Sequence, residues 1–131
     1  MNSAAAPTFV DISSHLAWFR SYAAEKTAQE KGDTSPMDLK LRHSMNVLEN
    51  ARHIVEGEKF DAPTARLCLL AALYHDVGRF EQYLRYHTFR DRESCNHGLM
   101  GVRILKAQGC LEQEPPETRK LVMAAVGMHN R

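Results

Sequence analysis

The sequence has almost no net charge, few cysteines and no long apolar run, and each shortage excludes a class of protein. Its 131 residues carry a formal net charge of +1 at pH 7 and contain no basic run, so charge gives no reason to expect a nucleic-acid partner. No uninterrupted apolar segment approaches the ~20 residues that a membrane-spanning helix needs. We therefore expect neither nucleic acid nor a membrane as a partner.

Cysteine use is equally sparse. Cys68, Cys95 and Cys110 are odd in number and far apart, and no CxxC pair occurs. Free thiols of this kind are typical of a reducing compartment and argue against a cysteine zinc site. The segment Met1–Val10 has neither the basic start nor the apolar core of a signal peptide. These features predict a cytoplasmic protein.

An alternation of apolar and polar residues, which would indicate a half-buried strand, is also absent, and helix start and stop signals recur instead. After a loose lead-in at Met1–Phe9, the sequence predicts an all-α bundle of about five main helices, with a short extra helix at 80–86. The main helices are expected from a cap at Asp11 or Ser13 to about Gln29, from a cap at Ser35 to near Gly57, from Asp61 to His75–Asp76, from a cap at Asn96 to Gly109, and from about Glu117 to Asn130.

The segment from Cys68 to Phe80 changes from apolar to polar within a few residues. From Leu67 to Leu73 it is apolar on nearly every side of a helical projection, so it should lie at the centre of the core. His75 and Asp76 follow, and Gly78 predicts a left-handed helix stop. A buried carboxylate is costly without a compensating cation or hydrogen bonds. Taken alone, the pair fits a solvated helix end as well as it fits a site.

Three further histidines stand at the edges or ends of expected helices: His43, His97 and His129. A lone half-buried histidine is more often a hydrogen-bonded core residue than a ligand. Four histidines and an aspartate, each at an element boundary, favour a metal site, since imidazole and carboxylate suit divalent iron, manganese, cobalt, nickel or zinc. The remaining histidines are not assigned to it: His15, His53 and His87.

This ordered set resembles the HD superfamily of metal-dependent phosphohydrolases, which is named for the His–Asp pair. The resemblance covers roughly Leu41 to Arg131 and is closest to bacterial proteins with a His-Asp-x-Gly-Arg-Phe turn. The stretches that carry it are Tyr74–His75–Asp76–Val77–Gly78–Arg79–Phe80, Thr88–Phe89–Arg90–Asp91–Arg92–Glu93–Ser94, and Asn96–His97–Gly98 with Gly101.

A length of 131 residues predicts one domain. We expect it to be HD-like, with an N-terminal helix and linker at 1–34 and a metal-site core at 35–131. The resemblance implies one or two divalent ions, iron or manganese first, with zinc, cobalt, nickel and magnesium as alternatives. Asp76 would bridge the ions and Arg79 would meet substrate phosphate, both as catalytic residues. Arg90 and Arg92 are further substrate-binding candidates. The ligand set that it implies is His43, His75 and Asp76 for the first metal, and His97 and His129 for the second.

The implied function is hydrolysis of a phosphoester of a nucleotide or another small phosphorylated metabolite. The alternative is a degenerate HD module that binds a nucleotide or a protein partner without turnover. The family pattern continues with a further Asp on a helix after the one carrying His129, whereas this sequence ends at Arg131. We therefore expect weaker metal binding in the group around His43 and a homo-oligomer that covers the apolar C-terminal helix.

Overall fold

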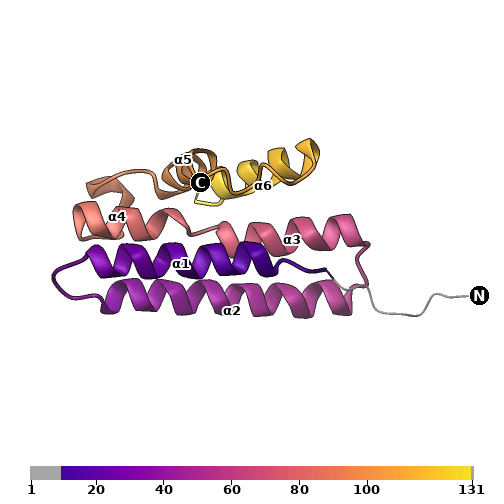
Figure 1. The fold of residues 1–131 in the computed structure, drawn as a ribbon, viewed down its shortest axis with the longest axis horizontal. Coiled ribbons are helices and arrows are strands. Elements are labelled where there is room, and N and C mark those ends of the chain that lie inside the picture. Colours follow the sequence, from indigo (N-terminus) through magenta and orange to yellow (C-terminus); the bar gives the residue numbers. More distant parts are fainter. Residues whose placement is uncertain (1–9, 131) are drawn as a thin grey trace, which may run out of the picture.

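The computed structural model describes residues 10–130, and every regular element in this range is helical (Figure 1). The all-α class is confirmed, and α4 is the short helix expected in the long connection. Residues 1–9, for which the sequence predicts a lead-in without signal-peptide character, and Arg131 lie outside the described residues. The elements are α1 (Ser13–Gln29), α2 (Ser35–Gly57), α3 (Ala62–Tyr74), α4 (Gly78–Tyr86), the 3₁₀ helix η1 (Asp91–Glu93), α5 (His97–Ala107) and α6 (Pro116–Met128).

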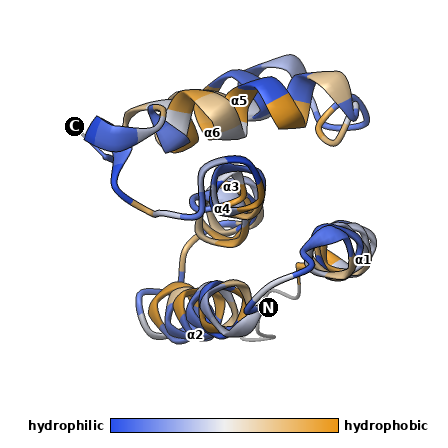
Figure 2. Cartoon of the chain, turned by 90° about the vertical axis from the view of Figure 1, so that its left-hand side faces the viewer, coloured by the Kyte–Doolittle hydropathy of each residue, from blue (hydrophilic) through white to orange (hydrophobic). Residues whose placement is uncertain are grey.

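The helices form three layers. Figure 2 shows α1 and α2 in one outer layer, α3 and α4 in the middle, and α5 with α6 in the other outer layer. In Figure 1, α3 and α4 follow one another along the middle layer. The junction between them, residues 75–77, therefore lies inside the molecule, with α2 on one side and the α5–α6 pair on the other.

The apolar segment of α3 is the centre of the core, as the sequence predicted. Leu69 is 2% exposed, and Leu70, Leu73 and Tyr74 are fully buried. Phe19 of α1 and Phe80 of α4 pack against this segment with their rings edge to face, 5.8 Å apart between centroids. Burial of a large apolar side chain stabilises the fold by about 1.5–3 kcal/mol. The helix that ends at the His–Asp pair is thus held firmly in place.

Two helix starts agree with the predicted caps. Asp61 caps α3, since its Oδ1 accepts a hydrogen bond of 2.8 Å from the backbone N–H of Thr64. Asn96 caps α5 in the same way, and its Oδ1 accepts from the N–H of Leu99 at 3.1 Å. Each side chain satisfies one of the free N–H groups of a first turn. The second cap matters for the site because it fixes the start of the helix that begins with His97.

The caps predicted for the first two helices are wrong in detail. Ser35 is the first residue of α2, and the N-cap is Thr34. The carboxylate of Asp33 accepts a hydrogen bond of 3.0 Å from the backbone N–H of Ser35. Asp11 acts similarly before α1, accepting from the N–H of Ser13 at 2.8 Å. In both places an aspartate two residues earlier, rather than the serine, accepts the backbone hydrogen bond.

Gly78 does not adopt the left-handed conformation that the sequence suggested. It is the first residue of α4, and in residues 10–130 the glycine with a positive φ is Gly109, at 64°, just after α5. A Cβ on Gly78 would overlap the carbonyl oxygen of His97 and lie 2.8 Å from the amide nitrogen of Gly101. The glycine is needed for close approach, because it lets the start of α4 press against the first turn of α5.

Some expectations about surfaces and organisation stay predictions. Leu121 and Met128 of α6 are 41% and 60% exposed, and the homo-oligomer expected through this helix is not tested. The division at residues 34 and 35 is likewise untested, although α1 contacts α3 and α4. Within residues 10–130, none of the helices is both long and apolar enough to cross a bilayer.

A buried polar network ties α1 and α3 to the loop between α5 and α6. His15 lies between Glu114, 2.9 Å from its Nε2, and the hydroxyl of Tyr74, 2.7 Å from its Nδ1. Arg66 donates from Nε and Nη2 to the two carboxylate oxygens of Glu114, both at 2.6 Å. Hydrogen bonding to Arg66 lowers the pKa of Glu114 from its ordinary 4.5 to about 2. This network could not be predicted from local patterns, since its members are far apart in the chain.

We expect Glu114 to make the fold sensitive to acid. Because its pKa is lower in the folded protein, its contribution is complete above pH 4.5 and is lost as the pH falls from there to about 2. Glu114→Gln should lower the free energy of unfolding at neutral pH by about 3 kcal/mol, the lower end for a buried pair, because Arg66 is partly exposed. It should also flatten the acid dependence. Urea denaturation over this pH range measures both effects, and the exposed neighbour Glu112→Gln is the control.

Candidate metal centre

Five side chains from three layers meet at the junction of α3 and α4. His75 and Asp76 follow directly after α3, while His43 comes from α2, His97 is the first residue of α5, and His129 follows α6. They form two groups that share Asp76, and within each group one candidate ligand atom of every residue lies within 4.8 Å of the others. The structure therefore brings together all the histidines that the sequence singled out, and their role as ligands stays a prediction.

The carboxylate of Asp76 divides its two oxygens between the groups. Its Oδ2 lies 3.5 Å from Nε2 of His43 and 3.5 Å from Nε2 of His75. Its Oδ1 lies 3.3 Å from Nε2 of His97 and 3.2 Å from Nε2 of His129. One carboxylate that faces two pairs of imidazoles has the arrangement required of a bridging ligand.

The outer nitrogens of three imidazoles are already engaged by acceptors. Nδ1 of His75 donates to the carbonyl oxygen of Ala72, and Nδ1 of His129 donates to that of Val126, both at 2.7 Å. Nδ1 of His97 lies 2.9 Å from both carboxylate oxygens of Asp91. In neutral rings with the proton on Nδ1, the Nε2 lone pair is left free.

These lone pairs face one another and a carboxylate. The Nε2 atoms of His97 and His129 are 2.9 Å apart, and those of His43 and His75 are 3.3 Å apart. Burial lowers the pKa of His75, which favours its neutral form. Electron pairs this close repel unless a cation lies among them. The donor set therefore fits divalent ions that accept both nitrogen and oxygen ligands.

Asp76 is ionised in this setting. Burial alone would raise its pKa, but the contact with His97, the charge that His75 carries at acid pH and the charge of Arg79 lower the pKa below the ordinary value. Its side chain is only 7% exposed, so most of the compensation comes from neighbouring side chains rather than from water. A buried, ionised carboxylate is the strongest anionic attraction that the cluster offers to a metal.

Asp91 supports the group formed by Asp76, His97 and His129 through a contact with the outer nitrogen of His97. The sequence analysis did not assign Asp91 to the site. Besides Nδ1 of His97, its carboxylate accepts hydrogen bonds from Nε2 of Gln82 at 3.0 Å and from Nδ2 of Asn130 at 2.8 Å. Burial opposes ionisation, but the hydrogen bonds from His97 and Gln82 lower the pKa of Asp91 to about 2. An aspartate between two arginines looks like part of a solvated loop. The available signals were its position six residues before His97 and its place in one of the stretches that carry the family resemblance.

The three arginines proposed for substrate lie in different settings. Nε of Arg79 lies 3.8 Å from Oδ1 of Asp76, so this arginine belongs beside the cluster. Its Nη1 donates to the carbonyl oxygen of Phe89 at 2.7 Å, and its buried Nε has no hydrogen-bond partner in the described part of the chain. Arg90 is exposed and pairs with Glu93 at 3.1 Å, and Arg92 is exposed as well. The substrate roles of all three stay predictions.

The other histidines lie outside the cluster. His53 is exposed on α2 and pairs with Glu49, whereas His87 pairs with Glu30 after the end of α4. His15 belongs to the buried network around Glu114. Their contacts account for them without a metal.

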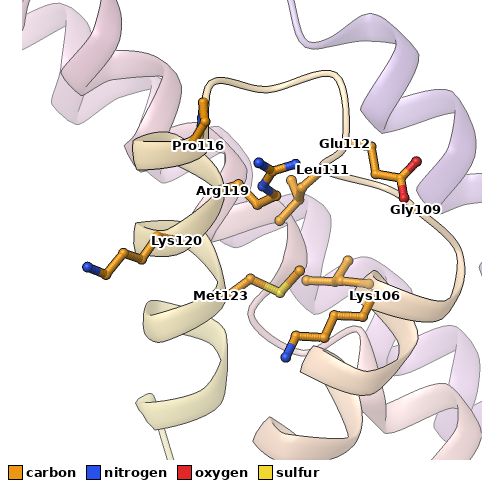
Figure 3. Close-up of a pocket in the computed structure, with 9 residues that line it drawn as sticks. Lys106, Gly109, Leu111, Glu112, Pro116, Arg119, Lys120 and Met123 are labelled. Carbon is orange, nitrogen blue, oxygen red and sulfur yellow. The ribbon is translucent and has the colours of Figure 1, made fainter.

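A cavity of about 440 Å³ lies away from the cluster, between the end of α5 and the start of α6 (Figure 3). None of the five clustered residues lines it. Aliphatic side chains and the stems of basic ones form its walls, among them Leu111, Met123, Lys106, Arg119 and Lys120. This cavity therefore has no part in the chemistry around Asp76.

Comparisons with known proteins agree with the geometry at the level of the family. The family model described as HD domain matches residues 41–131, a range that contains all five clustered residues. Neither the curated proteins nor the solved structures provide a match to this chain. The match thus bears on the family and leaves the substrate open.

We expect Asp91 to set the metal affinity of the group formed by Asp76, His97 and His129. Asp91→Asn should weaken Mn²⁺ binding by about 10–100-fold, because the carboxylate that orients the His97 ring and strengthens it as a ligand is lost. Calorimetric titration of the metal-free protein measures this. Glu93→Gln, an exposed change in the same 3₁₀ helix, is the matched control. Equal affinities in the Asn variant and the wild type would contradict the assignment.

Proposed function

The chain belongs to the HD domain family, and from this premise we propose that it is a metal-dependent phosphohydrolase acting on a nucleotide or another small phosphorylated metabolite. The family is typical of metal-dependent hydrolases, which supports the class of reaction. The observation that carries the proposal is the set of imidazole lone pairs gathered around the ionised Asp76. A donor set of this kind is suited to divalent cations.

Each of the two groups would hold one divalent ion, with Asp76 shared, and iron or manganese are the ions we propose. A divalent metal bound there supplies Lewis acidity towards a phosphoryl oxygen and lowers the pKa of water. Three protein ligands in each group leave coordination positions for water and substrate, as in catalytic rather than structural metal sites. The donor count therefore supports turnover.

The protein's own groups would receive and orient the substrate. The side chain of His43 is 46% exposed, whereas that of His97 is 4% exposed, so the cluster opens to solvent on the side of α2. A phosphoester would approach from that side. The guanidinium of Arg79 lies beside Asp76, and arginine binds phosphate oxygens with good geometry.

The second candidate is an HD module that binds a nucleotide or a protein partner without turnover. What favours it is the engagement of Arg79, whose Nη1 already donates to Gln82 and to the carbonyl oxygen of Phe89. Hydrolysis of a panel of phosphomonoesters and phosphodiesters, by manganese-loaded and by chelated protein, separates the two. It is measured as release of inorganic phosphate from the monoesters and as release of the alcohol from the diesters. Release that requires metal supports the hydrolase, and metal binding without release supports the module.

We expect Asp76→Ala to reduce activity more than any single change of a clustered histidine to alanine. The carboxylate serves both groups, so its loss should lower metal content and cut the rate about 100-fold or more, beyond the effect of an outer positioning residue. Metal analysis and initial rates measure the two effects. His53→Ala, outside the cluster, should behave as wild type. A variant without Asp76 that kept normal metal content and rate would refute the bridging role.

A further inference from the structure

Lys40 lies on the same face of α2 as His43. The two are three residues apart in one helix, a spacing that places their Cβ atoms about 5–6 Å from each other. Lys40 is only half-exposed, unlike its neighbour Arg42, which is exposed. A lysine that gives up part of its hydration beside a candidate catalytic cluster calls for a partner.

The partner within the protein is an aromatic ring. Nζ of Lys40 lies 4.9 Å from the centroid of the Phe89 ring, and Cζ of Arg79 lies 5.6 Å from the same centroid. Phe89 is itself held, since Tyr83 packs against its ring at 5.3 Å and Arg79 donates to its carbonyl oxygen. One ring thus contacts an ammonium from α2 and a guanidinium from α4, and the guanidinium also lies beside Asp76 of the cluster.

The charges of these two groups are not balanced equally. Arg79 has the carboxylates of Asp91, at 3.3 Å, and of Asp76, at 3.8 Å. Lys40 forms no ion pair with any of the residues from 10 to 130, and Nε of Arg79 donates no hydrogen bond there. Lys40 therefore has no anionic partner among these residues, and an anion bound beside the Phe89 ring would supply one.

We propose that Lys40 and Arg79, positioned by Phe89, form a subsite for a phosphoryl group of the substrate. This inference rests on the proposed function and narrows its substrate class. A terminal phosphate monoester carries about −1.5 to −2 charges at neutral pH, more than the single charge of a diester. Lysine acts on phosphate as a point charge and arginine as a planar donor. Two cations outside the metal groups therefore favour a phosphomonoester.

Equilibrium binding of inorganic phosphate to the manganese-loaded protein tests the subsite without turnover. Lys40→Gln should weaken phosphate binding about tenfold, the effect of losing one hydrogen bond to a charged group, while Lys40→Arg should retain most of the affinity. Arg42→Gln, the exposed neighbour on α2, should change it less than about twofold, since bulk charge is screened. Manganese affinity should be the same in all of these variants.

An unchanged phosphate affinity in Lys40→Gln would overturn the proposal, and so would an equal loss in Arg42→Gln. Turnover is measured separately with a phosphomonoester and a phosphodiester. If the Gln variant keeps the wild-type KM for the monoester, the subsite is wrong while the hydrolase stands. If the wild type hydrolyses neither ester, yet its phosphate binding depends on Lys40, the proposed function fails while the subsite stands.

Discussion

One buried carboxylate constrains the place where the three layers meet. Asp76 lies where the middle layer breaks between α3 and α4, and an ionised group in such a place must be compensated by charge or hydrogen bonds. A guanidinium from α4 supplies part of the compensation. A cation held by the imidazoles from α2, α5 and the end of α6 would supply the rest. The neighbours of the carboxylate are thus the candidate metal ligands, and a bound cation would serve both stability and function.

Close packing makes this convergence feasible. The first residue of α4 must touch the first turn of α5 if His97 is to reach Asp76, and any side chain at Gly78 would prevent it. The two fixed points of the junction are thus a buried apolar helix before it and a glycine after it. Neither contacts a ligand, yet together they determine where the imidazoles meet.

Local signals in the sequence predicted the positions of the helices and placed the five clustered residues at helix edges and ends. Apolar segments and helix ends can be recognised from neighbouring residues alone. What local signals could not supply were contacts between distant positions. The role of Gly78 was predicted as a turn because its true neighbours, His97 and Gly101, are about twenty residues away. Asp91 was overlooked for the same reason, since its value lies in bonds to Gln82 and Asn130. The contact between Lys40 and Phe89 is of the same kind, since the two residues are far apart in the sequence.

The direction of each helix explains why, of His75, His97 and His129, only His97 has a carboxylate behind its ring. His75 and His129 stand at C-terminal helix ends, where carbonyl groups of the last turn are free, and each ring donates from Nδ1 to the carbonyl three residues earlier. His97 stands at an N-terminal end, where the free backbone groups are N–H donors and cannot accept its Nδ1 proton. Asp91 supplies the missing acceptor and also accepts from the backbone N–H of His97, at 3.2 Å. The orientations of the His75 and His129 rings thus follow from helix geometry alone. The orientation of the His97 ring requires Asp91, which the fold brings beside it.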